Sequence, residues 1–82
     1  MSDPIFNKLV GCFENVFPEL PKGAIPAATH DNVTGWDSLA QVTLLTLIAE
    51  EFELDIDFEE FEGATSFATL LPAVREKSVH GR

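Results

Sequence analysis

The residues whose types and spacing could do chemistry gather at positions 35–39, Gly-Trp-Asp-Ser-Leu, where a polar corner leads into a long apolar stretch. A serine placed there can act as a nucleophile, carry a covalent group or cap a helix. A nucleophilic serine needs a base to take its proton and donors to hold an oxyanion. The histidines are His30 and His80, and no Gly-x-Ser-x-Gly elbow presents Ser38, so we expect no enzyme active site.

A metal site is the second chemistry to consider. The run from Glu50 to Glu62 holds eight of the fourteen acidic residues. Asp55 and Asp57 begin a pattern like that of a calcium loop, but the mid-loop glycine and the terminal glutamate spacing are missing. The two histidines and the single cysteine show no zinc spacing. We interpret the run as a solvated surface that faces a partner, and we expect no metal site.

Two segments precede Ser38 and must position it. Asp3 followed by Pro4 is typical of a helix start. Apolar residues at three- and four-residue spacing then predict an amphipathic helix, with Pro18 and Pro21 as its stop, and the stripe is Phe6, Leu9, Val10, Phe13 and Phe17. Cys12 lies off this stripe, and we expect a small, partly buried side chain there.

Residues 18–37 show no clear period and predict a loop of about twenty residues, which is long for a compact domain. Four apolar side chains should hold this loop against the helices: Ile25, Ala27, Ala28 and Val33. Long ordered loops are often functional, and this one leads directly to Ser38.

The second helix is expected from about Ser38 to Glu53. Ser38 and Gln41 match a capping box, in which each side chain satisfies a free amide of the other residue. One face of this helix should lie in the core and carries Leu44, Leu45, Ile48 and Phe52. The opposite face carries Leu39, Val42, Thr43, Thr46, Glu50 and Glu53. Apolar residues beside Ser38 on that exposed face indicate a docking surface.

A short third helix is expected within the acidic run. Asp57 can cap it, with Glu60 in the capping-box position. Phe58 and Phe61 should face inward, and Gly63 should end the helix.

The last helix should begin near Thr65 or Ser66, with Phe67, Leu70, Leu71 and Val74 as its buried stripe. Pro72 lies inside that stripe, where a proline costs about 3 kcal/mol, so we expect a kink or an early break. The residues from Lys77 onward are expected to be disordered.

These elements predict an all-α fold, a small four-helix bundle with three longer helices, one short helix and a long loop between helices one and two. At 82 residues the chain has room for one core. We therefore expect one domain over residues 1–77 and a flexible tail over residues 78–82.

The composition restricts the partners. A net charge of −9 should repel nucleic acid and anionic membranes and attract basic protein surfaces. No basic-then-apolar leader and no run long enough to span a bilayer occur, so we expect no stable membrane insertion. With a single cysteine as well, we expect a cytoplasmic monomer.

Ser38 therefore has two compatible interpretations, a helix cap and a modification site. Serine is among the commonest capping residues. The free amides and positive dipole end of a helix N-terminus also favour an anion, so a serine there is well placed to bear a phosphodiester.

The second interpretation gains from a family resemblance. Asp37-Ser38-Leu39 lies at a helix start, and Glu50-Glu51-Phe52 begins thirteen residues after Asp37. Ile56, a short helix and a Thr-rich start to the last helix follow. In an acidic chain of this length, these features resemble the acyl carrier proteins over most of the sequence, from Asp3 to about Val74.

The resemblance implies a modification of Ser38. A phosphopantetheinyl transferase would use coenzyme A and magnesium to attach 4′-phosphopantetheine to the hydroxyl, with Asp37 as the flanking residue of the motif. The thiol of the arm would hold an acyl group as a thioester. Successive partners would then act on the cargo: an acyl ligase, a synthase or an acyltransferase with a basic docking patch. The implied partner surface is Leu39, Val42, Thr46, Glu50 and Glu51.

The chain also departs from the family pattern. Ala40, Gln41 and Thr43 stand where fatty-acid carriers place acids, and Trp36 is more similar to specialised stand-alone carriers or to carriers of amino acids. We interpret the chain as a dedicated carrier of one pathway. The alternatives are an aminoacyl or peptidyl carrier of the same fold, and a non-enzymatic acidic protein that competes for a basic partner by charge.

Overall fold

The computed structural model describes residues 3–80, with side chains as far as Ser78. It contains three α-helices and one 3-10 helix: α1 (Pro4–Val16), η1 (Lys22–Ala27), α2 (Ser38–Phe52) and α3 (Phe67–His80). No strand forms within these residues, and Thr29 and Ser66 make a single isolated bridge. The predicted class, a small all-α bundle with three longer helices and one short helix, is confirmed.

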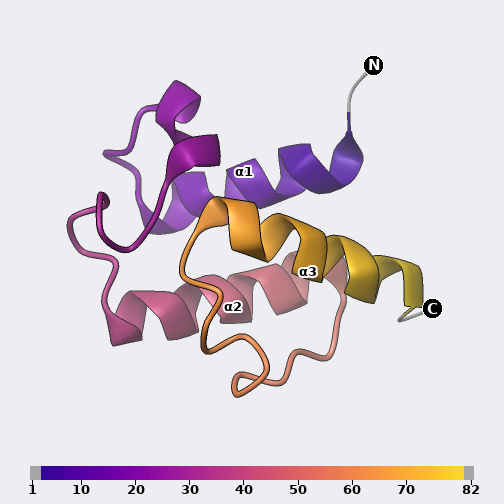
Figure 1. Cartoon of the computed structure of the whole chain (residues 1–82). Helices are drawn as coiled ribbons and strands as arrows, with labels where there is room; N and C mark the ends of the chain where they lie inside the picture. The colour runs from indigo at the N-terminus through magenta and orange to yellow at the C-terminus, as the bar shows by residue number, and fades with distance from the viewer. Residues whose placement is uncertain (1–2, 81–82) are drawn as a thin grey trace.

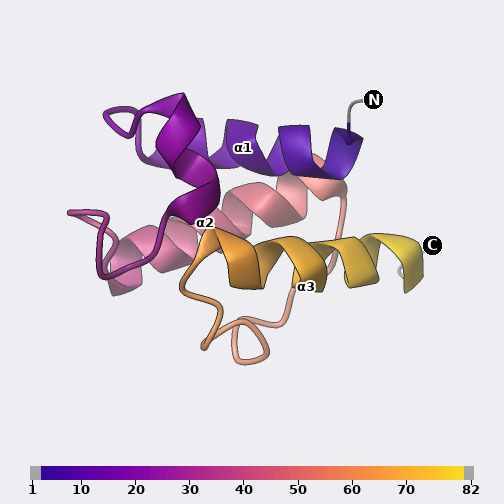
Figure 2. The same ribbon diagram turned by 45° about the horizontal axis from the view of Figure 1, so that its top comes forward.

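The helix α1 contacts each of the other helices. It runs antiparallel to α2 and α3, and both pack against it (Figure 1). η1 packs on α1 and α3 at the end where α1 finishes and α3 begins (Figure 2). The segment 53–66 returns from the end of α2 to the start of α3 along the outside of the bundle. The start of α2 therefore lies at the same end of the molecule as η1.

The predicted start of α1 is confirmed. The Asp3 carboxylate oxygen Oδ1 accepts hydrogen bonds from the amides of Ile5 (3.1 Å) and Phe6 (3.2 Å). Its other oxygen accepts from Arg75 of α3 at 2.7 Å. The Arg75 guanidinium holds the pKa of Asp3 below its usual value, with the capping amides adding to the effect. The cap of the first helix is thus also a contact with the last one.

The core is built mainly from Phe and aliphatic side chains, as the composition suggests. Phe13, Phe17 and Trp36 form an aromatic group, and Phe13 also meets Phe67 edge-on with ring centroids 5.2 Å apart. Cys12 is 1% exposed, which makes it fully rather than partly buried.

The long loop is held as predicted at three of the four expected positions. Ile25, Ala28 and Val33 are buried, whereas Ala27 is exposed because it ends η1 on the solvent side. Two backbone hydrogen bonds then tie the loop to the start of α3: His30 N–H to the Thr65 carbonyl and Phe67 N–H to the Ala28 carbonyl, both 2.9 Å. The loop is therefore anchored where it approaches Ser38.

The predicted short helix at Asp57 is wrong, and the short helix of the bundle is η1 instead. Asp57 does begin a turn, because its carboxylate accepts from the Glu59 amide at 3.0 Å. The turn does not propagate into a helix, since Glu59, Glu60 and Glu62 crowd like charges into it and it buries little surface. Phe61 is buried as predicted, but Phe58 is 41% exposed.

The helix α3 begins where the sequence indicates, with Ser66 Oγ accepting from the Thr69 amide at 3.1 Å. Of the kink or early break expected at Pro72, the early break is wrong: α3 continues through this residue. Proline removes only the bond to the Ala68 carbonyl, while buried side chains on both sides of it hold the helix to the core. α3 extends to His80, so the disorder expected from Lys77 onward and the flexible tail expected from residue 78 are both wrong as far as His80. Residues 81–82 lie outside the described range.

Candidate functional site

Ser38 is the first residue of α2, and the residue before it caps the helix. Asp37 has extended backbone angles, and its carboxylate accepts from the Ala40 amide at 2.9 Å. The predicted capping role of Ser38 is therefore wrong. Asp37 takes that role because its carboxylate lies one residue earlier, where it can reach the first turn.

The Ser38 side chain is free as a result. It is exposed, and its hydroxyl makes no hydrogen bond to any described residue. The amides of Ser38 and Leu39 also have no hydrogen-bond partner within residues 3–78. A hydroxyl that can be approached from solvent thus lies beside two backbone donors at the positive end of a helix.

Gln41 does not pair with Ser38 either. Its side-chain oxygen accepts from Trp36 Nε1 at 2.7 Å, and its Nε2 donates to the carbonyls of Phe61 (3.2 Å) and Ala64 (3.0 Å). One amide group therefore joins the loop before α2 to the turn that precedes α3.

Trp36 belongs to the site, but the sequence analysis noted it only through the family resemblance and did not predict its burial. It is 6% exposed and packs against Phe13 and Phe17 with ring centroids 5.4 Å away in each case. Just before it, Gly35 has a φ of +95°, a backbone angle that glycine adopts most readily. The sequence signal for this burial was a large aromatic between a turn glycine and a helix cap.

A cleft of about 480 Å³ opens beside Ser38. The start of α2, the end of the long loop and the turn before α3 surround it. Its lining is His30, Trp36, Asp37, Ser38, Gln41, Val42, Leu45, Phe58, Glu59, Glu62 and Thr65. Apolar side chains in this lining offer shelter for an apolar group, and the hydroxyl of Ser38 lies at the same cleft.

His30 is one of the two histidines considered as a base for a serine nucleophile. It lines the same cleft as Ser38, but its Nε2 lies 3.3 Å from Asp31 Oδ1, and no hydrogen bond joins it to Ser38. Within the described residues, no three His, Cys, Asp or Glu side chains gather as a metal site requires.

The exposed face of α2 carries four of the five residues predicted to bind a partner. Leu39 is 76% and Val42 45% exposed. The hydroxyls of Thr43 and Thr46 donate to the carbonyls four residues earlier, at 2.9 and 2.8 Å, which leaves fewer polar groups for solvent. Leu39, Val42, Thr46 and Glu50 line one groove of about 740 Å³, which also includes Asp37. This face is therefore largely apolar, with a carboxylate at each end.

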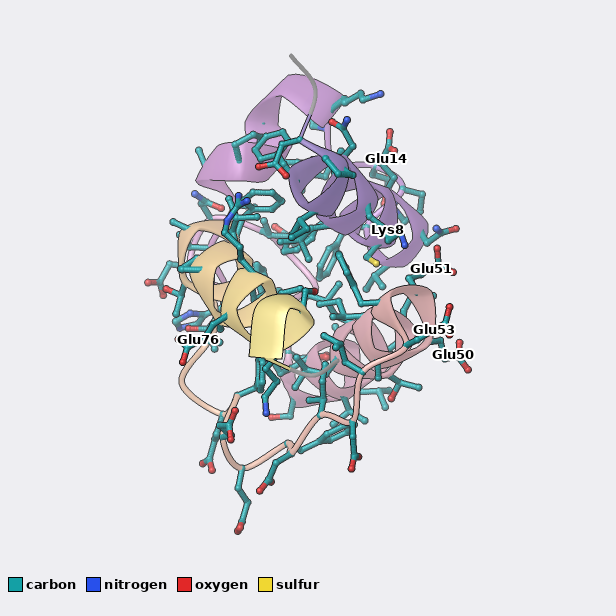
Figure 3. All side chains as sticks on the ribbon, turned by 90° about the vertical axis from the view of Figure 1, so that its right-hand side faces the viewer. Lys8, Glu14, Glu50, Glu51, Glu53 and Glu76 are labelled. Atoms are coloured by element: carbon teal, nitrogen blue, oxygen red, sulfur yellow. The ribbon has the colours of Figure 1, made fainter. Side chains whose placement is uncertain are left out.

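Glu51 lies apart from this groove. Figure 3 shows Glu50, Glu51 and Glu53 together at the end of α2, with Lys8 of α1 on the Glu51 side. Lys8 Nζ donates to the Glu51 carbonyl at 3.1 Å and lies 5.3 Å from the Phe52 ring centroid. Glu51 lines a second groove with Lys8, so a partner on the Leu39 face would meet Glu50 before Glu51.

Comparisons of the chain with models of protein families, with curated proteins and with solved structures found no match in any of the three. None of the helices within residues 3–80 combines the length and the apolar character that crossing a membrane requires.

Proposed function

We propose that this chain is a carrier protein that bears 4′-phosphopantetheine on Ser38 and shuttles thioester-bound acyl intermediates between the enzymes of a dedicated biosynthetic pathway. The observation that carries the proposal is the exposed, unbonded hydroxyl of Ser38 at the start of α2 beside a partly apolar cleft. The Asp37-Ser38-Leu39 motif in this helical context supplies the family resemblance.

The residues at the start of α2 fit a 4′-phosphopantetheine group. In the loading step, Ser38 Oγ attacks the phosphorus next to the pantetheine of coenzyme A, and adenosine 3′,5′-bisphosphate leaves. The partner transferase takes the hydroxyl proton and supplies magnesium. The free amides of Ser38 and Leu39 can donate to the resulting phosphodiester, and the helix dipole favours its negative charge. The attached group supplies a thiol that forms the thioester.

Asp37 has a defined task in this proposal. By capping α2 through Ala40, it keeps the first turn formed and leaves the exposed Ser38 hydroxyl without a capping role. Its exposed carboxylate is also available to a transferase for orienting metal or base.

The partners proposed are the transferase and a ligase, synthase or acyltransferase. Such enzymes would meet Leu39, Val42, Thr46 and Glu50 on the exposed face of α2. An apolar strip between the carboxylates of Asp37 and Glu50 fits a partner with an apolar contact surface flanked by basic residues.

Incubation of the chain with coenzyme A, magnesium and a broad-specificity phosphopantetheinyl transferase tests the proposal. We expect intact mass to rise by one phosphopantetheine group, and the Ser38→Ala variant to stay unchanged. Ser78→Ala, a matched serine substitution in α3 away from the exposed face of α2, is the control that should still be loaded. An unmodified wild type, or equal modification of Ser38→Ala, would overturn the proposal.

Two further measurements distinguish the acyl carrier from an aminoacyl carrier and from a charge-driven binding protein. Mass spectrometry of the chain from its native host distinguishes an acyl from an aminoacyl cargo. A charge-driven binding protein would instead hold its partner equally well with Ser38→Ala and would release it as salt increases.

A further inference from the structure

The turn 57–64 forms one wall of the cleft beside Ser38. Phe58, Glu59 and Glu62 of this turn line the cleft opposite Val42 and Leu45 of α2. Most of the turn is exposed, and its buried side chains are Phe61 and Ala64. A segment with few buried contacts opens at lower free-energy cost than the helices around it.

Charge also favours opening of this wall. Residues 53–62 contain six carboxylates, which repel one another at neutral pH. The ion pair that opposes this repulsion joins Lys77 Nζ of α3 to Glu60 at 2.9 Å. Both partners are partly exposed, so the pair holds the wall weakly.

Gln41 is a second polar tether of the wall. It donates to the Phe61 and Ala64 carbonyls, which lie at the one part of the turn that is buried. Its oxygen accepts from Trp36, whose ring is fixed by Phe13 and Phe17 in the core. The Gln41 side chain therefore links the wall to Trp36, which is fixed in the core.

We propose that residues 57–64 are a movable wall of the cleft and that Gln41 is the positioning residue that holds this wall closed beside Ser38. An opened wall moves Phe58 and Glu62 away from Val42 and widens the cleft, while the helices stay packed. This proposal rests on the proposed function only for what the cleft receives, an acyl group on the arm of Ser38, which the closed wall would shelter from solvent.

Two substitutions of Gln41 distinguish the contribution of its side-chain oxygen from that of its NH2 group. Gln41→Glu keeps an acceptor for Trp36 but loses the donors to Phe61 and Ala64. Gln41→Met keeps the length and loses all three hydrogen bonds. Asn15→Asp is the matched control, because Asn15 also donates its amide to a backbone carbonyl (Gly11, 2.9 Å) and lies outside the cleft.

Hydrogen exchange by NMR measures the opening. In both Gln41 variants, exchange of the Phe61 and Ala64 amides should rise by roughly fivefold for each hydrogen bond lost, while the Ile48 amide in the core keeps its rate. The indole N–H of Trp36, the single tryptophan, should exchange faster in Gln41→Met but not in Gln41→Glu. Asn15→Asp should match the wild type at all four positions.

Equal acceleration of Ile48 and of the turn would overturn the proposal, because it would mean a general loss of stability. Unchanged exchange in the turn would overturn it as well.

A second measurement tests the shelter on the loaded protein. The probe is octanoyl-phosphopantetheine, which the transferase moves from octanoyl-coenzyme A to Ser38 Oγ with release of adenosine 3′,5′-bisphosphate. The readout is cleavage of its thioester by hydroxylamine. We expect cleavage in Gln41→Glu to be about fivefold or more faster than in the wild type and in Asn15→Asp. Equal cleavage rates would overturn the sheltering role of the wall.

The two proposals fail in different ways. If the turn opens in the Gln41 variants but Ser38 accepts no group, the movable wall stands and the carrier function is overturned. If Ser38 is loaded but the turn shows no local opening, the carrier function stands and the movable wall is overturned.

Discussion

Asp37 and Ser38 are neighbours with separate tasks at the start of α2. Sequence reasoning gave both tasks to Ser38, because serine is a common cap and Gln41 stands three residues later. In the structure Asp37 bonds the Ala40 amide, and Gln41 bonds residues of other segments. Ser38 therefore keeps a hydroxyl that no helix contact occupies, which suits it to modification.

Stability measurements should separate the two residues. Asp37→Ala should lower the free energy of unfolding by about 1 kcal/mol, because the first turn of α2 loses its cap. Ser38→Ala should change it by less than about 0.5 kcal/mol, because an exposed, unbonded hydroxyl is removed. Urea unfolding followed by circular dichroism measures both, with Asp37→Asn as the control that keeps an acceptor. A larger loss in Ser38→Ala than in Asp37→Ala would contradict the cap assignment.

At the scale of elements, α2 joins the site to the acidic segment. It begins at the cleft and ends at Glu53, which adopts the left-handed conformation with φ 54° and ψ 46°. The Glu53 and Leu54 amides bond back to carbonyls of the last turn, which is how helices commonly end. Glycine is the usual residue at such a position, and a glutamate there carries strain.

Glu53→Gly should therefore raise the free energy of unfolding by about 1 kcal/mol, because the left-handed angles no longer strain a side chain. Glu50→Gly is the matched control, since it removes the same charge from the same exposed end of α2 but lies inside the helix. We expect it to lower the unfolding free energy by about 1 kcal/mol. Thermal unfolding at fixed pH measures the two variants. Shifts of the same sign would show that charge, and not backbone conformation, governs this end.

At the scale of the whole molecule, α1 supplies the core on which α2 and α3 are placed. Its Asp3 reaches Arg75 at the far end of the chain, and its Phe13 meets both Trp36 and Phe67. Its Cys12 is buried, and burial, with a smaller effect of Glu51, raises the pKa of the thiol to about 11. The thiol of this core is therefore protonated and inaccessible at neutral pH.

The folded chain should consequently show no fast-reacting thiol, and Cys12 should react with a thiol reagent about 100-fold or more slowly than free cysteine. The protein loaded at Ser38 should show one fast thiol, that of the arm, and a second thiol should appear only in denaturant. Absorbance titration of wild type and Cys12→Ala, before and after loading, measures both. Fast reaction of the unloaded, folded wild type would contradict the burial of Cys12.

Patterns within a few residues were sufficient to predict α1, α2 and α3, because the 3.6-residue period and the caps at Asp3 and Ser66 act through neighbours in sequence. The position of Ser38 at a helix start followed from the same local signals. They could not show that the turn at Asp57 would stop short of a helix, because that outcome depends on how little surface the turn buries.

The sequence by itself determined α1, α2 and α3, the apolar stripes that face the core and the exposed serine at the head of α2, but not η1. Only the tertiary structure decided which partners Gln41 takes, since the carbonyls of Phe61 and Ala64 lie twenty and more residues away. It also decided that Trp36 is buried and that a cleft opens beside Ser38. A buried polar group bonds whatever unpaired donor or acceptor the fold brings near it, and spacing along the chain does not encode that proximity.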